Sequence, residues 1–243
     1  MISPNILFED DDILVIEKPA GVIVNNSDTA KNLLTIQDWI QEQYKFPKIF
    51  TEENSEFEKR SGIVHRLDKE TSGILIIAKN QESFENLQKQ FKSHEVKKTY
   101  IALVHGDVIP KTGEINVPIG RLPWNRTRFG IYAQGRESQT NYLVLETKKS
   151  NTDRQNEIFS LVELYPKTGR THQIRVHMQH IGFPIVSDAL YAGRKTSKKD
   201  RKILKRHFLH ASKIYFIHPR TGKILDLTSP LPADLVDFID SLI

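Results

Sequence analysis

The sequence predicts an α+β fold, in which a mostly antiparallel β-sheet is covered on one side by helices. Three observations lead to this prediction: strand-like segments outnumber helical ones, short turns join many neighbouring segments, and no linker-like stretch marks a domain boundary. A length of 243 residues suits one large domain, so we expect a single domain over residues 1–243.

Strands are predicted where apolar and β-branched residues gather in short runs. A turn at Lys18–Gly21 and another at His218–Gly222 separate neighbouring runs. The predicted strands are Ile13–Glu17, Val22–Val24, Ile74–Lys79, Thr99–Val104, Tyr142–Glu146, Ile158–Leu164, Phe208–Ile217 and Lys223–Thr228.

Helices are predicted where apolar residues recur every three or four positions. One such helix contains Ile36, Trp39, Ile40 and Tyr44, and a second contains Phe84, Leu87 and Phe91 with Asn80 as its N-cap. A third follows Gly169 and ends near Gly182, and a fourth begins with Pro232 as its first residue. The polar, acidic residues 51–60 predict a surface loop.

Composition excludes several classes of protein. There are no cysteines, so disulfides, thiolate nucleophiles and cysteine metal sites are absent. The apolar runs are far shorter than the roughly 20 residues that a membrane-spanning helix needs. Because the first residues are acidic and lack an apolar core, they do not resemble a signal peptide. We expect a cytoplasmic protein that does not associate with membranes.

Positive charge is concentrated in two segments. Residues 194–206 contain eight basic residues and one acid, whereas the rest of the chain has slightly more acids than bases. Residues 121–136 contain four arginines and no acid. Such clusters attract polyanions, of which nucleic acid is the commonest in the cytoplasm. A solvated loop that keeps the protein soluble is the alternative interpretation of either segment.

The most informative segment is Gly62-Ile-Val-His-Arg-Leu-Asp-Lys-Glu-Thr-Ser-Gly73. Its apolar start leads into a polar turn with His65, Arg66 and Asp68, just before a predicted strand. Turns on a rigid sheet can hold catalytic groups that are both exposed and fixed. Spacing alone equally fits a charged surface turn in which Asp68 caps the backbone.

A second segment, Gly169-Arg-Thr-His-Gln-Ile-Arg-Val-His-Met-Gln-His180, combines arginines with three histidines. The histidines are five and three residues apart and lack the i, i+4 spacing of zinc-binding helices, so we expect no metal here. A basic helix start offers backbone N–H groups and arginines to an anion. Ordinary packing with solvated arginines remains the alternative.

These two segments resemble signature motifs of the RluA-like RNA pseudouridine synthases. Further similar pieces follow in family order: Val15-Ile-Glu-Lys-Pro-Ala-Gly21, Lys98-Thr-Tyr-Ile-Ala-Leu-Val104, Pro184-Ile-Val-Ser-Asp188 and Leu209-His-Ala-Ser212. Many members carry an N-terminal S4-type RNA-binding module. Here the catalytic pattern begins by Ile6, so we expect RNA affinity to come from the catalytic domain itself.

The resemblance implies an enzyme that isomerises uridine in rRNA or tRNA without cofactor or metal. It implies that Asp68 starts glycosidic cleavage, that Arg175 keeps Asp68 ionised and oriented, and that Tyr100 stacks on the uracil. Arg66 resembles the arginine that fills the space left by the flipped nucleotide. We expect further RNA contacts from Arg121, Arg126, Arg128, Arg170, His172, Lys195, Lys198 and Lys199, and we expect a monomer.

Two other functions remain open on the residues alone. A protein that binds RNA without turnover needs the basic segments but not Asp68, Tyr100 and Arg175 together. A nucleoside glycosidase needs a paired acid and base, and the motif segments offer Asp68 without an obvious second carboxylate.

Overall fold

The computed structural model describes residues 2–26, 33–44, 55–123, 125–150 and 157–242. The chain forms two compact units, each assembled from two separate stretches of sequence. The first unit contains Met1–Lys97 and Lys213–Ser229, and the second contains Lys98–Ser212 and Pro230–Ile243. The single domain expected from the sequence stays a prediction, because the two units are interleaved along the chain.

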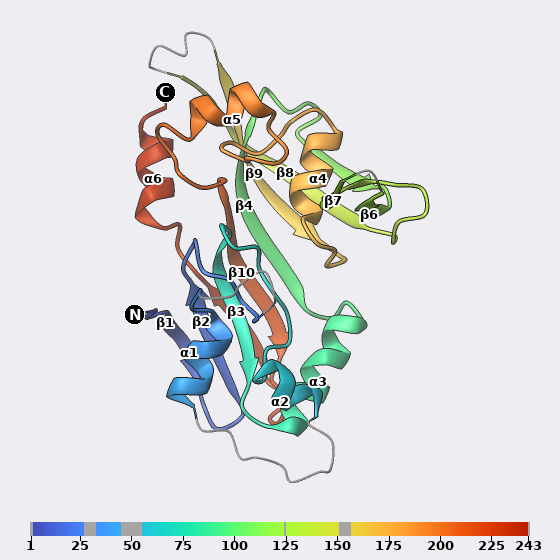
Figure 1. Cartoon of the computed structure of the whole chain (residues 1–243), viewed down its shortest axis with the longest axis vertical. Coiled ribbons are helices and arrows are strands. Elements are labelled where there is room, and N and C mark those ends of the chain that lie inside the picture. The colour runs from blue at the N-terminus through green and yellow to red at the C-terminus, as the bar shows by residue number, and fades with distance from the viewer. Residues whose placement is uncertain (1, 27–32, 45–54, 124, 151–156, 243) are drawn as a thin grey trace. The chain divides into compact units, whose positions relative to one another are not determined.

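The first unit is built on strands in the order β1-β2-β3-β10, with β11 added to β10 (Figure 1). The pairs β1–β2, β2–β3 and β10–β11 are antiparallel. Every residue of β3 is buried, as expected for a strand inside a sheet. The strands are β1 (Asn5–Glu9), β2 (Ile13–Lys18), β3 (Ser72–Ala78), β10 (Leu209–Ile217, from Lys213 onward in this unit) and β11 (Ile224–Thr228).

Three capped helices accompany this sheet: α1 (Ile36–Gln43), α2 (Glu56–Arg60) and α3 (Gln81–Lys92). Thr35 and Ser55 each form a capping box with an acidic residue three positions later. Asn80 accepts a hydrogen bond from the backbone N–H of Ser83, which confirms its predicted capping role. Phe84 and Leu87 of α3 bury their side chains among those of β2 and β3.

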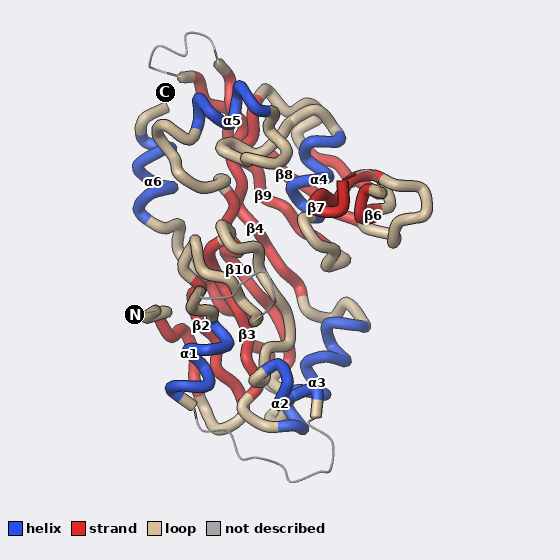
Figure 2. The backbone as a smooth tube through the Cα atoms, viewed as in Figure 1, coloured by secondary structure: helices blue, strands red, loops and turns tan. Residues whose placement is uncertain are grey.

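The second unit is built on strands in the order β10-β4-β9-β8-β5. The pairs β4–β9, β8–β9 and β5–β8 are antiparallel. A separate two-stranded hairpin, β6–β7, lies beside α4 (Figure 2). The strands are β4 (Lys97–His105), β5 (Thr112–Asn116), β6 (Ile119–Leu122), β7 (Asn125–Ile131), β8 (Gln139–Lys149) and β9 (Ile158–Pro166).

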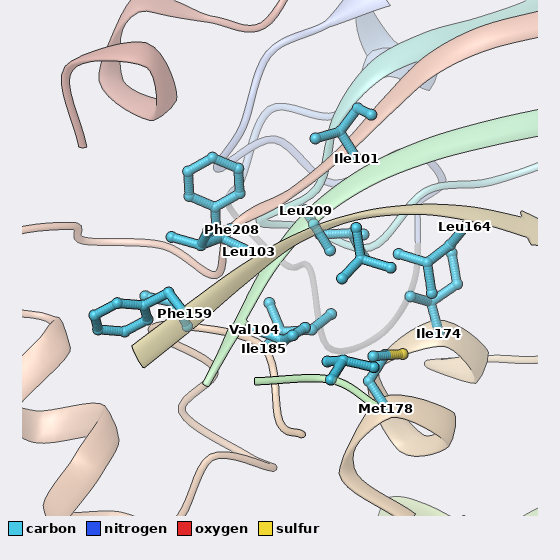
Figure 3. Packing of buried hydrophobic residues seen from close by; sticks show 14 of the residues in the cluster. Ile101, Leu103, Val104, Phe159, Leu164, Ile174, Met178, Ile185, Phe208 and Leu209 are labelled. Carbon is cyan, nitrogen blue, oxygen red and sulfur yellow. The ribbon is translucent and has the colours of Figure 1, made fainter. Parts of the chain in front are cut away.

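The second unit's helices are α4 (Gln173–His180), α5 (Arg194–Asp200) and α6 (Ala233–Asp240). Ile174 and Met178 of α4 point toward Leu164 and Val104 of the sheet (Figure 3). Leu235 and Phe238 of α6 join the same buried cluster. None of the helices in the described ranges is long and apolar enough to cross a membrane.

The α+β class and its mostly antiparallel sheet are confirmed, but several local predictions are wrong. Val22–Val24 forms only an isolated bridge, between Ile23 and Thr35. Part of the predicted loop 51–60 is α2, while residues 51–54 lie outside the described residues. Pro232 is the N-cap of α6 instead of its first residue. The predicted helix between Gly169 and Gly182 is confirmed as α4, and Gly182 has a φ of +90° after its end.

Residues 201–206 of the basic segment are turns and irregular backbone, but residues 194–200 are not a loop, because they form α5. Its sequence lacks an apolar stripe, so hydrophobic periodicity gave no signal. Polar contacts hold it instead: the buried Asp200 carboxylate lies 2.9 Å from His105 Nε2 and accepts a hydrogen bond from the Ser187 N–H. In the same way, most of the arginine-rich segment 121–136 belongs to the β6–β7 hairpin and not to a loop.

We predict that Leu103→Ala lowers the free energy of unfolding by about 2–5 kcal/mol, because Leu103 is fully buried and its truncation leaves a cavity. Leu145→Ala, at a side chain that is 47% exposed, should change it by less than about 0.5 kcal/mol. Urea denaturation of both variants tests this. Equal effects would contradict the burial described here.

Candidate active site

The residues predicted to act together fall in different units. Asp68 and Arg66 belong to the first unit, whereas Tyr100 and Arg175 belong to the second. The residues predicted to contact RNA through positive charge, Arg66 excepted, also lie in the second unit.

The segment that contains Asp68 leaves α2 through Gly62. Gly62 has a φ of +74°, and a Cβ there would overlap the carbonyl oxygen of Ala78, so only glycine fits. The Ala78 N–H donates to the Gly62 carbonyl at 2.9 Å, and Ile63 bridges Ile77. The chain then turns at Asp68, whose carbonyl accepts from the Thr71 N–H. Asp68 is half-buried and Arg66 is exposed.

The buried Lys18 holds this turn in place through hydrogen bonds from its side chain. Lys18, 1% exposed, donates from Nζ to the carbonyls of Pro19, Val22 and Lys69, at 2.7, 2.9 and 3.2 Å. The Lys69 carbonyl, directly after Asp68, also accepts from the Gly21 N–H. Three carbonyls satisfy the three donors of the ammonium group. The Lys18–Gly21 turn therefore fixes the backbone next to Asp68.

The side chain of His65 also links this segment to neighbouring elements. Its Nε2 accepts the N–H of Ile76 in β3 at 2.9 Å, so this nitrogen is unprotonated. The ring stacks on Phe91 of α3 at 4.7 Å between centroids. These contacts tie the Asp68 segment to β3 and α3.

In the second unit, Arg175 of α4 forms a buried ion pair with Asp188. Its Nε and Nη2 donate to the two carboxylate oxygens at 2.7 and 2.9 Å, with side chains 6% and 0% exposed. Oδ1 of Asp188 also accepts from the N–H groups of Leu190 and Tyr191. Burial acts to raise the pKa of Asp188, but the hydrogen bond and charge of Arg175, together with the charge of His207 and the N–H of Leu190, outweigh it and the pKa is lowered.

Tyr191 connects this ion pair to the β6–β7 hairpin. The guanidinium carbons of Arg175 and Arg128 lie 5.0 and 5.2 Å from the centre of its ring. Its hydroxyl donates to the Phe129 carbonyl, accepts from the Phe129 N–H, and lies 2.8 Å from His172 Nδ1. Because the hydroxyl hydrogen is used on Phe129, His172 Nδ1 is the donor toward Tyr191.

Tyr100 lies on β4, paired with Leu164 of β9. Directly paired residues point to the same face of a sheet, and Leu164 packs on Ile174 of α4 in the core. Tyr100 is half-buried at the border of that core. An aromatic ring there can offer a face to a planar base.

The predicted RNA-binding residues differ in how they are held. Arg121 is exposed and lies over the Phe129 ring, and Arg128 donates to the Leu190 carbonyl. Arg170 donates from Nε to the Glu137 carbonyl at 3.1 Å. On α5 the side chains of Lys195, Lys198 and Lys199 are exposed, and Lys199 pairs with Glu157. The side chain of Arg126 lies outside the described residues.

His172 precedes α4 with a left-handed backbone, φ 58°, so the helix begins only at Gln173, three residues after Arg170. Within the described ranges, the group of residues spaced to hold a metal ion is Asp10, Asp12 and His218, not the histidines of α4. Their atoms already have partners: His218 pairs with Asp10 and Arg220 with Asp12.

Residues 12–180 match the family described as RNA pseudouridylate synthase. The chain belongs to this family. It is 44% identical, over 73% of its length, to an "Uncharacterized RNA pseudouridine synthase" of Chloroflexus aurantiacus, and it spans 52% of that relative. It is 36% identical over 99% of its length to "Ribosomal large subunit pseudouridine synthase D" of Nitrosomonas europaea, spanning 66% of that relative.

The fold agrees with this membership in the pseudouridylate synthase family. The structure of "Human RNA Pseudouridylate Synthase Domain Containing 1" superposes with a TM-score of 0.73 at 26% identity, covering 99% of this chain and 88% of the human one. The chain thus spans about half to two thirds of the two curated relatives but nearly all of a solved member of the family.

Sequence reasoning assigned no role to Lys18, Asp188 or Tyr191. Lys18 and Asp188 stand inside the segments that carry the family resemblance, and that position was the available signal. Tyr191 follows such a segment by three residues. Its role as a hub could not be read from the sequence, because its partners come from β7, α4 and the turn before α4.

We predict that Lys18→Met lowers the free energy of unfolding by about 3 kcal/mol, because it removes three hydrogen bonds, from the buried Nζ to the carbonyls of Pro19, Val22 and Lys69, each worth about 1 kcal/mol. Lys69→Met removes an exposed side chain of the same turn and should have little effect. Urea denaturation compares the two variants. A Lys18→Met protein as stable as the wild type would contradict the anchoring role.

We predict that Asp188→Asn destabilises the protein by about 3–5 kcal/mol, because it leaves the Arg175 charge buried without its counter-ion. The pKa of Asp188 is lowered from 3.8, so the stabilising effect is present above that value and is lost as the pH falls through the lowered pKa. The stability difference from the wild type should therefore persist at about pH 5 and shrink toward about pH 2. A difference that grows in acid would contradict this sign.

Proposed function

We propose that this protein is an RNA pseudouridine synthase that acts on large-subunit ribosomal RNA and uses Asp68 to start the reaction. The main support is the match of residues 12–180 to the pseudouridylate synthase family. Within this range, the His65–Gly73 segment holds Asp68 in an anchored turn. The name of the Nitrosomonas relative favours ribosomal RNA as the substrate.

The reaction converts a uridine in the chain to its C-glycoside isomer. The N1–C1′ bond breaks, the uracil turns, C5 joins C1′, and the proton lost from C5 is balanced by one gained at N1. No atom is added or removed overall, and the reaction as proposed uses no cofactor or metal. The protein must supply a carboxylate, a means of holding the freed uracil, and a base for the C5 proton.

Three side chains fit these tasks. Asp68 supplies the carboxylate, as nucleophile toward C1′ or as base toward a ribose proton. Tyr100 stacks on the uracil from the border of the second unit's core. Arg175 orients Asp68, and its own orientation is fixed by Asp188, which leaves Nη1 of the guanidinium outside that bidentate pair.

The uridine must leave its stack before it reacts, at a cost of a few kcal/mol. Arg66, exposed beside Asp68, is suited to replace it, because a planar guanidinium can stack and donate hydrogen bonds together. Arg121 and Arg128 of the hairpin, Arg170 and His172 before α4, and Lys195, Lys198 and Lys199 of α5 supply further contacts to the RNA. The chain binds as a monomer in this proposal.

The deciding test is a pseudouridine map of RNA from a strain that lacks the gene, complemented with wild type or with Asp68→Asn. We expect ribosomal sites to vanish on deletion and to return only with the wild type. Purified Asp68→Asn should bind RNA within about twofold of the wild type, because one carboxylate contributes little to phosphate contacts. Restoration by Asp68→Asn would contradict its catalytic role.

The same map separates the other functions. Loss of transfer-RNA sites alone would move the substrate from ribosomal to transfer RNA. An unchanged map together with intact RNA affinity would favour a binding protein without turnover. Free uracil released by the purified protein would favour a glycosidase.

We predict that replacing Lys195, Lys198 and Lys199 with serine weakens RNA binding and flattens its salt dependence. Each lost phosphate contact should reduce the slope of log K against log salt by about 0.7 for single-stranded RNA. Replacement of Lys111, Lys148 and Lys149, which lie on or beside β5 and β8, provides a charge-matched control. An unchanged slope would assign α5 to solubility.

A further inference from the structure

Lys98 is a lysine for which the proposed reaction has no task. It lies on β4 two residues before Tyr100, and residues two apart in a strand point to the same face of the sheet. It is half-buried, whereas its neighbour Lys97 is exposed. A lysine and the aromatic residue proposed to stack on uracil therefore share one face of β4.

The amino group of Lys98 reaches the turn that leads into α4. A Cβ placed on Gly169 would lie 3.9 Å from Lys98 Nζ, so a side chain at this exposed position would contact the ammonium group. Arg170 follows directly, and its Nε is engaged by the Glu137 carbonyl. Because Gly169 has no side chain, a ligand can approach Nζ closely at this turn.

Lys98 differs from the other buried cations of the protein in lacking a counter-group. Lys18 donates to three carbonyls, and Arg175 is paired with Asp188. Within the described ranges, no hydrogen bond or ion pair is recorded for Lys98 Nζ. An ammonium group that is withdrawn from water and unpaired is unfavourable.

The pKa of Lys98 agrees with the lack of a partner for its ammonium group among the described residues. Burial lowers the pKa of Lys98 from 10.5 to about 8, and no charged neighbour contributes to the shift. The titratable and charged groups on β4 and on the adjoining elements of this unit include Lys97, Tyr100 and His105 of β4, Glu163 and Tyr165 of β9, His210 of β10, and Lys167 and Arg170 of the turn. Tyr165 donates to Glu163, so that carboxylate already has a partner. At neutral pH Lys98 is mostly protonated, and none of the described residues accepts a hydrogen bond from it.

We propose that Lys98 binds a backbone phosphate of the substrate RNA next to the reacting nucleotide, at a subsite beside the exposed Gly169. This proposal rests on the proposed function. A phosphodiester carries one negative charge at all relevant pH values and has oxygens that accept from Lys Nζ and from backbone N–H groups. Binding would supply the counter-charge that the free protein lacks, so Lys98 would favour the RNA-bound state over the free one.

The first test compares Lys98→Met with Lys97→Met in the full chain. We expect Lys98→Met to bind a transcript of large-subunit ribosomal RNA roughly tenfold more weakly at about pH 7, the effect of one charge-assisted hydrogen bond. Lys97→Met, at the exposed neighbour, should bind within about twofold of the wild type. Lys98→Arg should recover part of the affinity, because it keeps the charge.

Stability of the free protein separates this role from a structural one. Lys98→Met should melt at a higher temperature than the wild type, because it removes an unpaired buried charge. The folded-state pKa is lowered, so the wild type is penalised below about pH 8, and the advantage of Lys98→Met should disappear as the pH rises toward 10.5. A lower melting temperature for Lys98→Met would make Lys98 a structural residue and overturn the proposal.

A direct measurement does not require turnover. In protein labelled with ¹³C at lysine Cε, the resonance missing from Lys98→Met reports the titration of Lys98. Addition of uridylyl-(3′→5′)-uridine, which holds a single phosphodiester, should raise the pKa of Lys98 from about 8 toward 10.5. An unmoved pKa at saturating dinucleotide would overturn the proposal.

The outcomes also separate this proposal from the proposed function. If the wild type forms pseudouridine while Lys98→Met binds RNA normally and only turnover falls, the function stands and the phosphate subsite is wrong, with Lys98 then acting on a proton. If the wild type forms no pseudouridine but the dinucleotide raises the pKa of Lys98, the phosphate subsite stands without the synthase activity.

Discussion

The ion pair between Arg175 and Asp188 is the interaction on which the second unit's polar architecture depends. It joins α4 to the 184–191 segment, and Asp188 also fixes the N–H of Tyr191. Through Tyr191 the hairpin that carries Arg121 and Arg128 is connected to the same pair. A buried charge pair is retained at low cost only when every donor and acceptor is matched, and here the carboxylate accepts four hydrogen bonds.

In the first unit, a buried lysine has its charge matched by backbone carbonyls. Lys18 gathers three backbone carbonyls, one of them directly after Asp68, and so converts a polar turn into a fixed one. His65 adds a second tether by accepting from β3. A catalytic group must be positioned to within about half an ångström. These buried partners give the Asp68 turn a rigidity that an exposed loop would lack.

Lys98 stands apart from this pattern of matched charges. Proteins tolerate local unfavourable features mainly where a ligand later compensates them. An unpaired ammonium on the same face of β4 as Tyr100 is such a feature, and it explains why stability and RNA affinity are expected to move in opposite directions when Lys98 is replaced. The unpaired charge of Lys98 destabilises the free protein, and RNA removes this destabilisation when it binds. Lys98 therefore favours the RNA-bound state.

The α+β class, most strands and the helices with apolar periodicity can be predicted from the sequence, because those elements bury a regular stripe or face. The sequence also located the segments around Asp68, Tyr100 and Arg175, because short motifs in family order are local features of the chain. Asn80 could be named as a cap because a cap acts within three residues.

Other features depend on contacts between residues that are far apart in the sequence. Helix α5 has no apolar stripe. Its last residue, Asp200, contacts His105 and the Ser187 N–H, which lie 95 and 13 residues away in the sequence. Helix α4 begins at Gln173 and not directly after Gly169, because Gln173 Oε1 accepts the Arg170 N–H and His172 has a left-handed backbone. The partner of Arg175, the hub at Tyr191 and the isolation of Lys98 all arise from long-range packing, which pattern and spacing do not encode.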